Sequence, residues 1–351
     1  MAVRITKPAV NIREKLAELE RPIGVNGAAL MATSTPQDAF SLIGAGRRNM
    51  IINGKLQVSQ RGTYTSSTNT TSTTYYLDRW YWNGDLSGTS LQHKLDQTVN
   101  GITVNTLYYT TTSASYFISI GQQIESNVWS HLKGRNITMS AWVKTNNSKV
   151  GLRLYTGVQN IGPRHSGNGQ WEYLVWKFTI PSDATSLYPL IDNYTGSYNA
   201  FANEYVEFTM VQLEEGNIAT PFEHRMYAEE LRLCQRYYFD LRPSSGVSVY
   251  PTVVESSGTD RWYAVIKLPV TMRTTPTLNV PGTYTGTSNI RLNWPFPGST
   301  TLSAITGLYF VSPDAFTLYG TKSSSFAAAG NMVGLEIASA LTSTIGANAE
   351  I

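Results

Sequence analysis

The stretch VQLEEGNIATPFEHRMYAEELRLCQRYY, residues 211–238, separates two kinds of β-type sequence. Short runs typical of strands precede it, and EEGNIATP (214–221) then indicates a turn. From 226 to 239 the apolar side chains change to a helical spacing. Strand-like sequence resumes after this helix with different turn residues. The pattern therefore predicts two β modules joined by a short helix.

The composition narrows the class of protein. Charged residues make up 15% of the 351 residues, against about 25% in an average globular protein, whereas tyrosine (21) and tryptophan (8) are abundant. A net charge of +3 without clustered Lys or Arg does not predict nucleic-acid binding. The lone cysteine excludes an intrachain disulfide. The N-terminal stretch lacks the apolar core of a secretory signal, and no apolar run is long enough to insert in a membrane.

Residues 1–47 lack strand signals and form a predicted helical arm. Ile12, Leu16 and Leu19 lie on one face of a short helix, and a second helix is predicted over 35–43. A helix of about three turns is marginal alone in water, so its apolar face needs a partner surface. The arm packs on its own module or attaches the chain to another protein. The second reading is favoured because the face lies far in sequence from any core.

Residues 48–225 form the first predicted β module. Runs of alternating residues recur about every ten positions with Gly, Asn, Asp or Pro between them, which favours an antiparallel sandwich or jelly roll. In NITMSAWVKT (136–145), Ile137, Met139, Ala141 and Val143 form the inward set. Met210 and Gln212 are predicted to share a face with Val206 and Phe208. The strand candidates are 50–52, 75–82, 91–95, 103–110, 116–123, 136–144, 151–158, 172–180, 188–192 and 205–213.

Residues 226–351 contain the connecting helix and a second, smaller β module. Its strand candidates are 247–254, 262–270, 277–280, 289–294, 308–311, 315–318 and 332–338. The fold class is thus all-β: a jelly-roll sandwich, a smaller C-terminal β module, a short helical N-terminal arm and a helix near 226–239.

Familiar catalytic and metal-binding motifs are missing from the sequence. There is no phosphate-binding glycine loop, no nucleophile elbow and no zinc spacing, so no cofactor and no metal are predicted. A carboxylate pair of a polysaccharide depolymerase is the remaining catalytic possibility, but the favoured reading is that these residues serve in turns and at strand edges. A structural Ca²⁺ near Asn53 and Glu207 or Glu214 is a weaker alternative. The carboxylates considered are Asp78, Asp85, Asp192, Glu204 and Glu207.

The aromatic residues are the better functional signal. They cluster near 75–82 and again near 262–310. Aromatic rings bind sugars through their faces, while nearby polar groups fix the hydroxyls. The competing explanation is that alternate aromatics fill the sandwich core. The candidate glycan-binding residues are Tyr76, Trp80, Trp82, Trp262 and Trp294.

Several motifs together give the chain a family likeness. They are NMIINGKLQVSQRG (49–62), YYLDRW (75–80), IGQQIE (120–125), LKGRNITMSAWVKT (132–145), VQLEEGNIATPFEHR (211–225), ELRLCQRYY (230–238), LPVTMRTTPTL (268–278) and ANAEI (347–351). In this order they resemble bacteriophage and prophage tail-fibre-like virion proteins, whose central domain is similar to a carbohydrate-binding-module jelly roll. The likeness covers about 48–351, and the chain departs from long fibres in lacking a repetitive shaft.

The resemblance implies a non-enzymatic, homotrimeric virion protein, made in the host cytoplasm, that binds host surface polysaccharide. Ile12, Leu16 and Leu19 would then attach it to other virion proteins of the tail, the portal and neck, or the capsid. The alternatives are a head or neck decoration protein without receptor binding, and a depolymerase. Because the apolar face of the connecting helix is broad, we expect Leu231, Cys234 and Tyr238 to contact neighbouring subunits.

Overall fold

The computed structural model describes two β modules and the segment that joins them. The described residues are 32, 48–62, 64, 68–69, 74–84, 89–111, 118–197, 203–242, 247–254, 261–279, 290–293, 300–301, 304–321, 332–338 and 346–350. The predicted arm helices, Asp85 and Trp294 lie outside these residues. Within them the strands form antiparallel sheets, and the all-β prediction is confirmed.

The first module is a sandwich of two six-stranded sheets, counted over the described residues. Successive strands cross repeatedly between the two sheets, as in jelly rolls. The first sheet runs β1 (Thr68–Asn69), β4 (Thr89–Val99), β5 (Ile102–Thr111), β12 (Glu204–Glu215), β7 (Asn136–Thr145) and β10 (Trp171–Thr179). The second runs β2 (Thr74–Leu77), β3 (Trp80–Gly84), β6 (Ile118–Gly121), β11 (Tyr188–Asp192), β8 (Gly151–Tyr155) and β9 (Gln159–Arg164).

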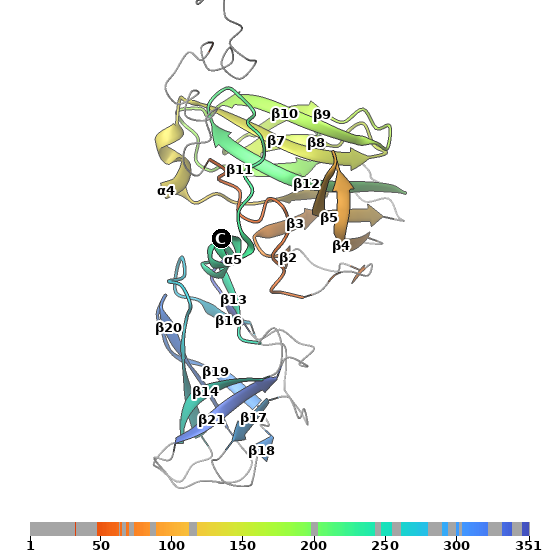
Figure 1. Ribbon diagram of the computed structural model, residues 1–351. Helices are drawn as coiled ribbons and strands as arrows, with labels where there is room; N and C mark the ends of the chain where they lie inside the picture. Colours follow the sequence, from red (N-terminus) through yellow and green to blue (C-terminus); the bar gives the residue numbers. More distant parts are fainter. Residues whose placement is uncertain are drawn as a thin grey trace, which may run out of the picture.

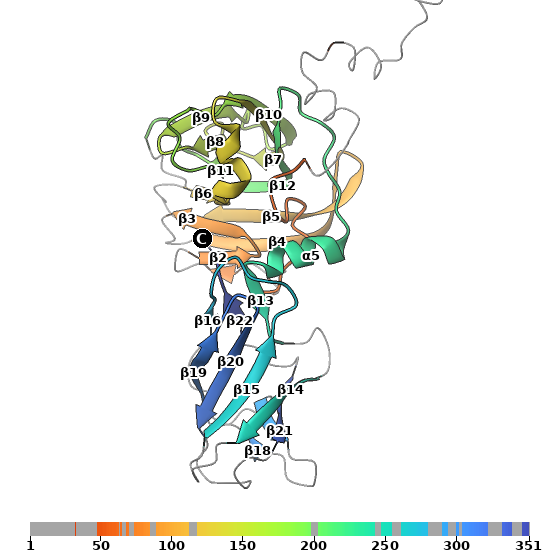
Figure 2. The same cartoon turned by 90° about the vertical axis from the view of Figure 1, so that its left-hand side faces the viewer.

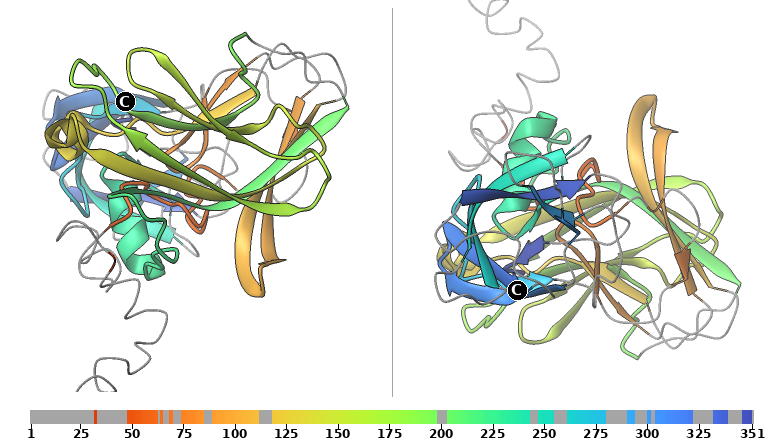
Figure 3. Two further views of the ribbon diagram at one scale, coloured as in Figure 1. Left: turned by 90° about the horizontal axis from the view of Figure 1, so that it is seen from above. Right: turned by 90° about the horizontal axis from the view of Figure 1, so that it is seen from below.

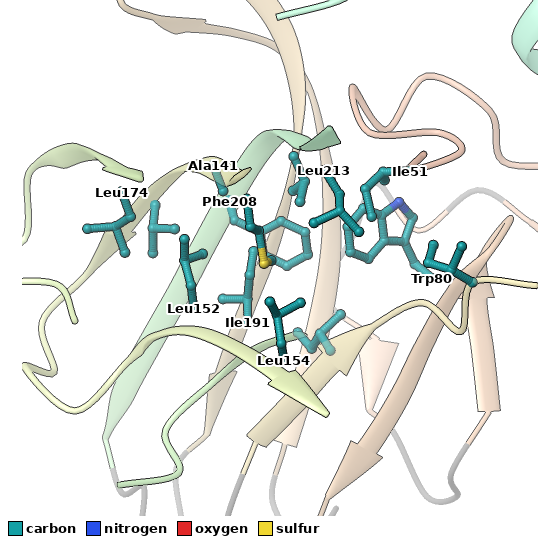
Figure 4. Close-up of a cluster of buried hydrophobic side chains, with 14 of the residues drawn as sticks. Ile51, Trp80, Ala141, Leu152, Leu154, Leu174, Ile191, Phe208 and Leu213 are labelled. Atoms are coloured by element: carbon teal, nitrogen blue, oxygen red, sulfur yellow. The ribbon is translucent and has the colours of Figure 1, made fainter. Parts of the chain in front are cut away.

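The two sheets bury one apolar core between them. Ile137, Met139, Ala141 and Val143 are at most 1% exposed, which confirms the inward set predicted for β7. Figure 4 shows the side chains of this core from both sheets gathered in one layer. Seen from above and below, the β4–β5 hairpin reaches beyond the rest of the sandwich (Figure 3). A short helix, α4 (Ser126–Trp129), and a 3-10 turn (Ser130–Leu132) follow β6.

Strand β12 departs from simple alternation. Its register against β7 shifts between Thr209 and Gln212, and Met210 takes a positive φ of 49°. A bulge of this kind changes which side of the strand the following residues face. Met210 therefore packs with Val99 and Val104 outside the main core, and the prediction that Met210 shares the face of Phe208 is wrong.

The segment 48–62 is not a strand but a loop that the sandwich and helix hold from several sides. Asn49 accepts hydrogen bonds from the backbone N–H groups of Ile51 (2.9 Å) and Leu213 (3.0 Å). Gly54 packs so tightly that an added Cβ would lie 2.3 Å from the carbonyl oxygen of Val211. The strand predicted over 50–52 is wrong, because only Met50 bonds the backbone of β12 (2.8 Å to the Leu213 carbonyl), whereas side chains accept from the N–H groups of Ile51 and Ile52.

The C-terminal module contains a curved sheet and a small one. In order, the larger sheet has β18 (Thr300–Thr301), β17 (Ile290–Asn293), β21 (Met332–Ala338), β14 (Val247–Val254), β15 (Arg261–Lys267), β20 (Ala315–Thr321) and β19 (Ala304–Val311). The small sheet has β13 (Tyr238–Asp240), β22 (Gly346–Asn348) and β16 (Thr277–Asn279). Trp262, Ile266 and Phe316 build a separate core with Ala347 of β22.

Helix α5 (Tyr227–Gln235) lies between the two modules, as Figures 1 and 2 show. It is shorter than the predicted helix over 226–239, because the chain turns at Arg236 and continues as β13. Tyr238 therefore belongs to a strand that pairs with β22, with Asn348 opposite it.

Candidate functional site

Three of the tryptophans predicted to bind glycans lie inside the protein. Trp80, Trp82 and Trp262 are only 2%, 1% and 1% exposed. Trp80 donates its indole N–H to the carbonyl of Asn53 (2.9 Å) and points into the core of the sandwich (Figure 4). Trp80 and Trp82 share the inward face of β3, since side chains two residues apart point the same way. The prediction that these three residues bind glycans is wrong.

The other two predicted glycan residues do not define a site. Tyr76 is half-buried, packs against the sandwich core and meets Tyr64 edge-on with ring centroids 5.6 Å apart. Trp294 lies outside the described residues.

The chain itself covers most of the predicted subunit-contact residues. Cys234 and Tyr238 are fully buried, and Leu231 is half-buried. Burial raises the pKa of the Cys234 thiol well above its usual value, so the thiol stays protonated. The guanidinium carbon of Arg61 lies 3.8 Å from the centre of the Tyr238 ring. Cys234 and Tyr238 thus pack within one chain, and their prediction as subunit contacts is wrong.

The residues around α5 form a dense polar cluster, which we call the junction: Arg61, Arg79, Glu125, Tyr237, Tyr238 and Glu350. Glu350 accepts hydrogen bonds from Arg61 (3.1 Å) and from Arg79. Arg79 also lies over the ring of Tyr237, with its guanidinium carbon 3.7 Å from the ring centre. Glu125 accepts from Arg236 (3.0 Å) and Tyr237. Five of the motifs that carry the family resemblance meet here, which gives those motifs a structural role.

The carboxylates considered for catalysis are engaged by neighbouring groups. Asp192 is buried between Arg153 and Arg164. Glu204 accepts from the Asn147 amide (2.6 Å). Burial raises the pKa of Asp78 to about 6, although Arg61 and hydrogen bonds from Gln60 oppose this shift.

The residues weighed for a Ca²⁺ site use their oxygens within the protein. The amide oxygen of Asn53 accepts from the N–H of Val58 (3.0 Å), and Glu214 accepts from Thr220 and Gln212. Glu207 accepts from Thr106 and Lys94. Among the described residues, no group of three or more His, Cys, Asp or Glu is placed to hold a metal ion.

The first sheet carries a second set of aromatic residues on the side opposite its core. We call this side the outer face, and its aromatic residues are Tyr108, Trp142, Trp171, Tyr173 and Tyr205. Four of the five neighbour a core residue in their strand: Leu107 and Tyr109 flank Tyr108, Ala141 and Val143 flank Trp142, Leu174 follows Tyr173, and Val206 follows Tyr205. All five are half-buried or exposed, with Tyr173 41% exposed. Trp142 and Trp171 pack partly against Val99, Val104 and Met210, so these two rings are partly accessible to a ligand, and Tyr173 is the most exposed of the five.

The outer face is ordered in rows that run across the strands. In one row, pairing places Gln92 opposite Tyr108, Tyr108 opposite Glu207, Glu207 opposite Lys144, and Lys144 opposite Trp171. This row crosses β4, β5, β12, β7 and β10. Since neighbouring strands lie about 4.8 Å apart, it spans roughly 19 Å. The row contains two rings, Tyr108 and Trp171, separated by the hydrogen-bonding side chains of Glu207 and Lys144.

One aromatic pair lies beside the row, and a second extends the row from Tyr108. The rings of Trp142 and Tyr173 face each other across β7 and β10, with centroids 5.3 Å apart. The rings of Tyr108 and Tyr205 stack at 5.7 Å, with 22° between their planes. Stacked and tilted rings present an extended apolar surface with polar edges.

Charged groups of both signs lie within the row. The Lys94 ammonium lies 3.5 Å from the centre of the Tyr108 ring and 3.2 Å from a Glu207 oxygen. Thr106 donates to the other Glu207 oxygen (2.6 Å). Burial, together with Tyr108 and Glu207, raises the pKa of Tyr205. The outer face combines flat rings with fixed donors and acceptors.

Sequence reasoning missed the outer face although a usable signal was present. With Ile137, Met139, Ala141 and Val143 facing inward, alternation alone places Trp142 on the opposite side of β7. The same reasoning applied to WEYLVWKFT (171–179) separates Tyr173 from Leu174.

No protein-family model matches the chain, and no curated protein matches it. Similar solved structures include the enzymatically active domain of tailspike protein 4 from bacteriophage CBA120, at 12% identity and a TM-score of 0.30. That match covers 48% of this chain and 21% of the tailspike chain, so the chain spans about a fifth of that protein.

Two further structures come from xylanases. The C-terminal family 22 carbohydrate-binding module of Clostridium thermocellum Xyn10B is 16% identical, with 45% of this chain and 98% of that chain covered and a TM-score of 0.27. The tandem of two such modules from Paenibacillus barcinonensis Xyn10C is 11% identical, with 82% and 96% covered and a TM-score of 0.27. Likenesses this distant assign no activity or ligand to the chain.

No helix in the part of the chain that the structure describes is long and apolar enough to cross a membrane.

Proposed function

We propose that this protein is a non-catalytic virion component that binds a host surface polysaccharide through the outer face. The observation that carries the binding proposal is the transverse row from Gln92 to Trp171, with Trp142 and Tyr173 beside it. A polysaccharide lying across the strands would meet rings for its apolar C–H surfaces and polar groups for its hydroxyls. The chemistry of the face thus suits a repeating sugar chain.

The same sheet supplies a rigid base for these side chains. The strands that carry them pack their other side against the core, where Val143 and Phe208 are fully buried. A ligand then needs little rearrangement of the protein, and a preformed surface loses less conformational entropy on binding.

The polysaccharide proposal is tested by affinity electrophoresis in gels that contain purified host envelope polysaccharide. We expect retardation of the wild-type protein and its loss in the double variant Trp142→Ala and Tyr173→Ala. The matched control is Tyr155→Ala, which changes a half-buried tyrosine of the second sheet. Unchanged retardation of the double variant would overturn the assignment of the outer face.

The virion role rests on the family resemblance of the motifs. We propose attachment through residues 1–47, with Ile12, Leu16 and Leu19 facing the particle, and assembly as a homotrimer.

Immunogold labelling of particles tests the location of the protein, on the tail or on the head. A variant lacking 1–47 should remain soluble and be missing from particles. Native mass spectrometry should give three copies, and a monomer at micromolar concentration would contradict the trimer.

The same experiments separate two other functions. A head or neck decoration protein would label on particles and show no retardation by any host polysaccharide. A depolymerase would release oligosaccharides from the host polysaccharide, which chromatography of the reaction mixture detects. The non-catalytic proposal is supported by the engagement of Asp192 with two arginines and of Glu207 with Lys94 and Thr106.

A further inference from the structure

The charged side chains of the outer face differ in exposure according to their sign. On β5, β12, β7 and β10, the carboxylates that lie on this face in the described part of the chain are Glu207 and Glu214, which are 4% and 0% exposed. The lysines of the face are accessible, since Lys94 and Lys144 are half-buried and Lys177 is exposed. A ligand that approaches the face from solution therefore meets positive charge first.

Hydrogen bonds within the protein already occupy both carboxylates. Glu207 accepts from the hydroxyl of Thr106 (2.6 Å) and from the ammonium of Lys94 (3.2 Å). Glu214 accepts from the backbone N–H (2.9 Å) and the hydroxyl (2.6 Å) of Thr220. Neither carboxylate is therefore available to pair with a further cation of the face.

Lys144 lies in the row without a partner for its charge. Strand pairing places it between Glu207 on β12 and Trp171 on β10. The Glu207 carboxylate bonds Lys94 instead, and the Lys144 side chain forms no ion pair or hydrogen bond with the residues that the structure describes. Its ammonium thus keeps donors for a ligand, and its bond to an anion is roughly twice as strong as one between neutral groups.

The remaining carboxylates around the row lie at its edges. Glu172 accepts from the backbone N–H of Ser166 (3.0 Å), and Glu204 accepts from the Asn147 amide (2.6 Å). Asp96 lies beyond the row, at the bulge of the β4–β5 hairpin. The unpaired charge within the row is therefore positive, and an aromatic ring lies beside it.

We propose that the polysaccharide bound by the outer face is acidic, and that a carboxylate or phosphate group of its repeating unit pairs with Lys144. Trp171 supplies a half-buried ring for the apolar side of a sugar, and Lys144 lies opposite it on the neighbouring strand, within reach of a substituent of that sugar. Lys94, which Glu207 shares, adds a weaker attraction. This inference rests on the proposed function, because it names the class of polysaccharide bound at the same site.

The test compares three forms of the purified host envelope polysaccharide by affinity electrophoresis of the full chain. One form is native, one has its carboxylates reduced with carbodiimide and borohydride, and one has its phosphates removed with hydrofluoric acid. We expect binding about tenfold weaker to the form that has lost the anionic group. The form that loses binding identifies the group as carboxylate or phosphate.

The outcomes separate this inference from the proposed function. Equal retardation by all three forms would overturn the acidic polysaccharide and leave polysaccharide binding intact. No retardation by the native form would overturn both.

Substitutions at Lys144 test the pairing itself. Lys144→Gln removes the charge and should weaken binding of the native form about tenfold, without changing binding of the form that lacks the anionic group. Lys144→Arg keeps the charge and should bind more tightly than Lys144→Gln. The matched control is Lys267→Gln, which removes the charge of an exposed lysine on β15 of the C-terminal module and should bind as the wild type does. Wild-type binding by Lys144→Gln would contradict the pairing.

Salt gives an independent measurement on the unmodified protein. Raising the salt concentration from about 20 mM to about 300 mM should weaken binding of the native form, because salt screens charges that are open to solvent. Binding of the form that lacks the anionic group should change little. The same salt dependence for both forms would count against an ionic contact.

Discussion

The junction and the outer face contain the same chemical groups and differ in burial. In the junction, Arg79 lies over the Tyr237 ring and pairs with Glu350, and both charged side chains are at most 4% exposed. On the outer face, Lys94 lies over the Tyr108 ring and pairs with Glu207, with Lys94 25% exposed. A cation, a carboxylate and a tyrosine ring thus recur in both places.

The difference shows what marks a binding surface in this protein. In the junction the charged groups and rings are buried and bond one another, and they come from segments far apart in the sequence. Their contacts therefore hold the two modules together. On the outer face the rings are only partly covered: Tyr173, which packs beside Trp142, keeps 41% of its surface exposed. Chemical type alone does not separate structural from ligand-binding aromatics here, whereas exposure does.

The largest expected effect is in the junction. Glu350→Ala leaves the guanidinium groups of Arg61 and Arg79 buried without their carboxylate, which costs about 3–5 kcal/mol of unfolding free energy. Glu207→Ala is the matched control and should cost about 1 kcal/mol, since water reaches Lys94. Urea denaturation measures both. Equal losses of unfolding free energy in the two variants would show that the ion pairs of the junction and of the outer face contribute equally to stability.

The next effect concerns pH. Asp78 has a pKa of about 6 in the folded protein against 3.8 for an ordinary aspartate. The folded state therefore holds the extra proton, so this contribution to stability is complete below about pH 4 and is lost as pH rises through 6. The loss amounts to about 2–3 kcal/mol.

Asp78→Asn is the reference for this effect, since it removes the titrating group. The difference in unfolding free energy between wild type and variant should change between pH 4 and pH 7. Parallel stability curves for the two proteins would contradict the raised pKa.

A smaller effect is expected on the outer face, and it falls on binding. Trp142→Ala should weaken polysaccharide binding about tenfold, which corresponds to about 1.4 kcal/mol. The unfolding free energy should fall by less, since the ring is half-exposed. Trp82→Ala, in the core, should lower stability by about 3–5 kcal/mol. Isothermal titration and urea denaturation separate the two kinds of tryptophan.

The smallest effect compares the two cation–ring contacts. Lys94→Ala should lower stability by about 0.5–1 kcal/mol, because the ammonium is partly hydrated in the folded protein. Arg79→Ala should cost several times more, since it removes the buried partner of Glu350. A double-mutant cycle with Tyr108→Leu isolates the ring contact of Lys94. A coupling free energy of zero would show that the contact between Lys94 and the Tyr108 ring does not stabilise the protein.

Local pattern was enough to predict much of the fold. The alternation of β7 gave the correct inward residues, and the strands 188–192, 247–254 and 332–338 match the structure to the residue. Local pattern failed where side chains replace a neighbouring strand, as around Asn49, and where a bulge changes the facing of Met210. Both depend on partners distant in the chain: Asn49 bonds Leu213, 164 positions away, and the bulge arises against β7, about 70 positions away.

The candidate site was harder to predict, for a related reason. The motif YYLDRW contains both Trp80 and Arg79, yet one fills the core and the other reaches Glu350 across 271 positions of sequence. Residue type singles out Trp80 and Arg79 as candidates, but it does not show which side chains the folded chain buries. Trp142 lies in a strand that the sequence predicted, whereas Trp171 precedes the predicted strand 172–180 and is the first residue of β10. The facing of both follows only once the inward set is fixed.

The long separations in the junction also bear on the order of folding. Glu350 lies 289 positions from Arg61 and 271 from Arg79, whereas the β4–β5 hairpin joins neighbouring segments. Closing a long loop costs entropy that only later contacts repay. We therefore expect the hairpins of the sandwich to form early and the Glu350 contacts to close last. Formation of this ion cluster would then report that both modules are already in place.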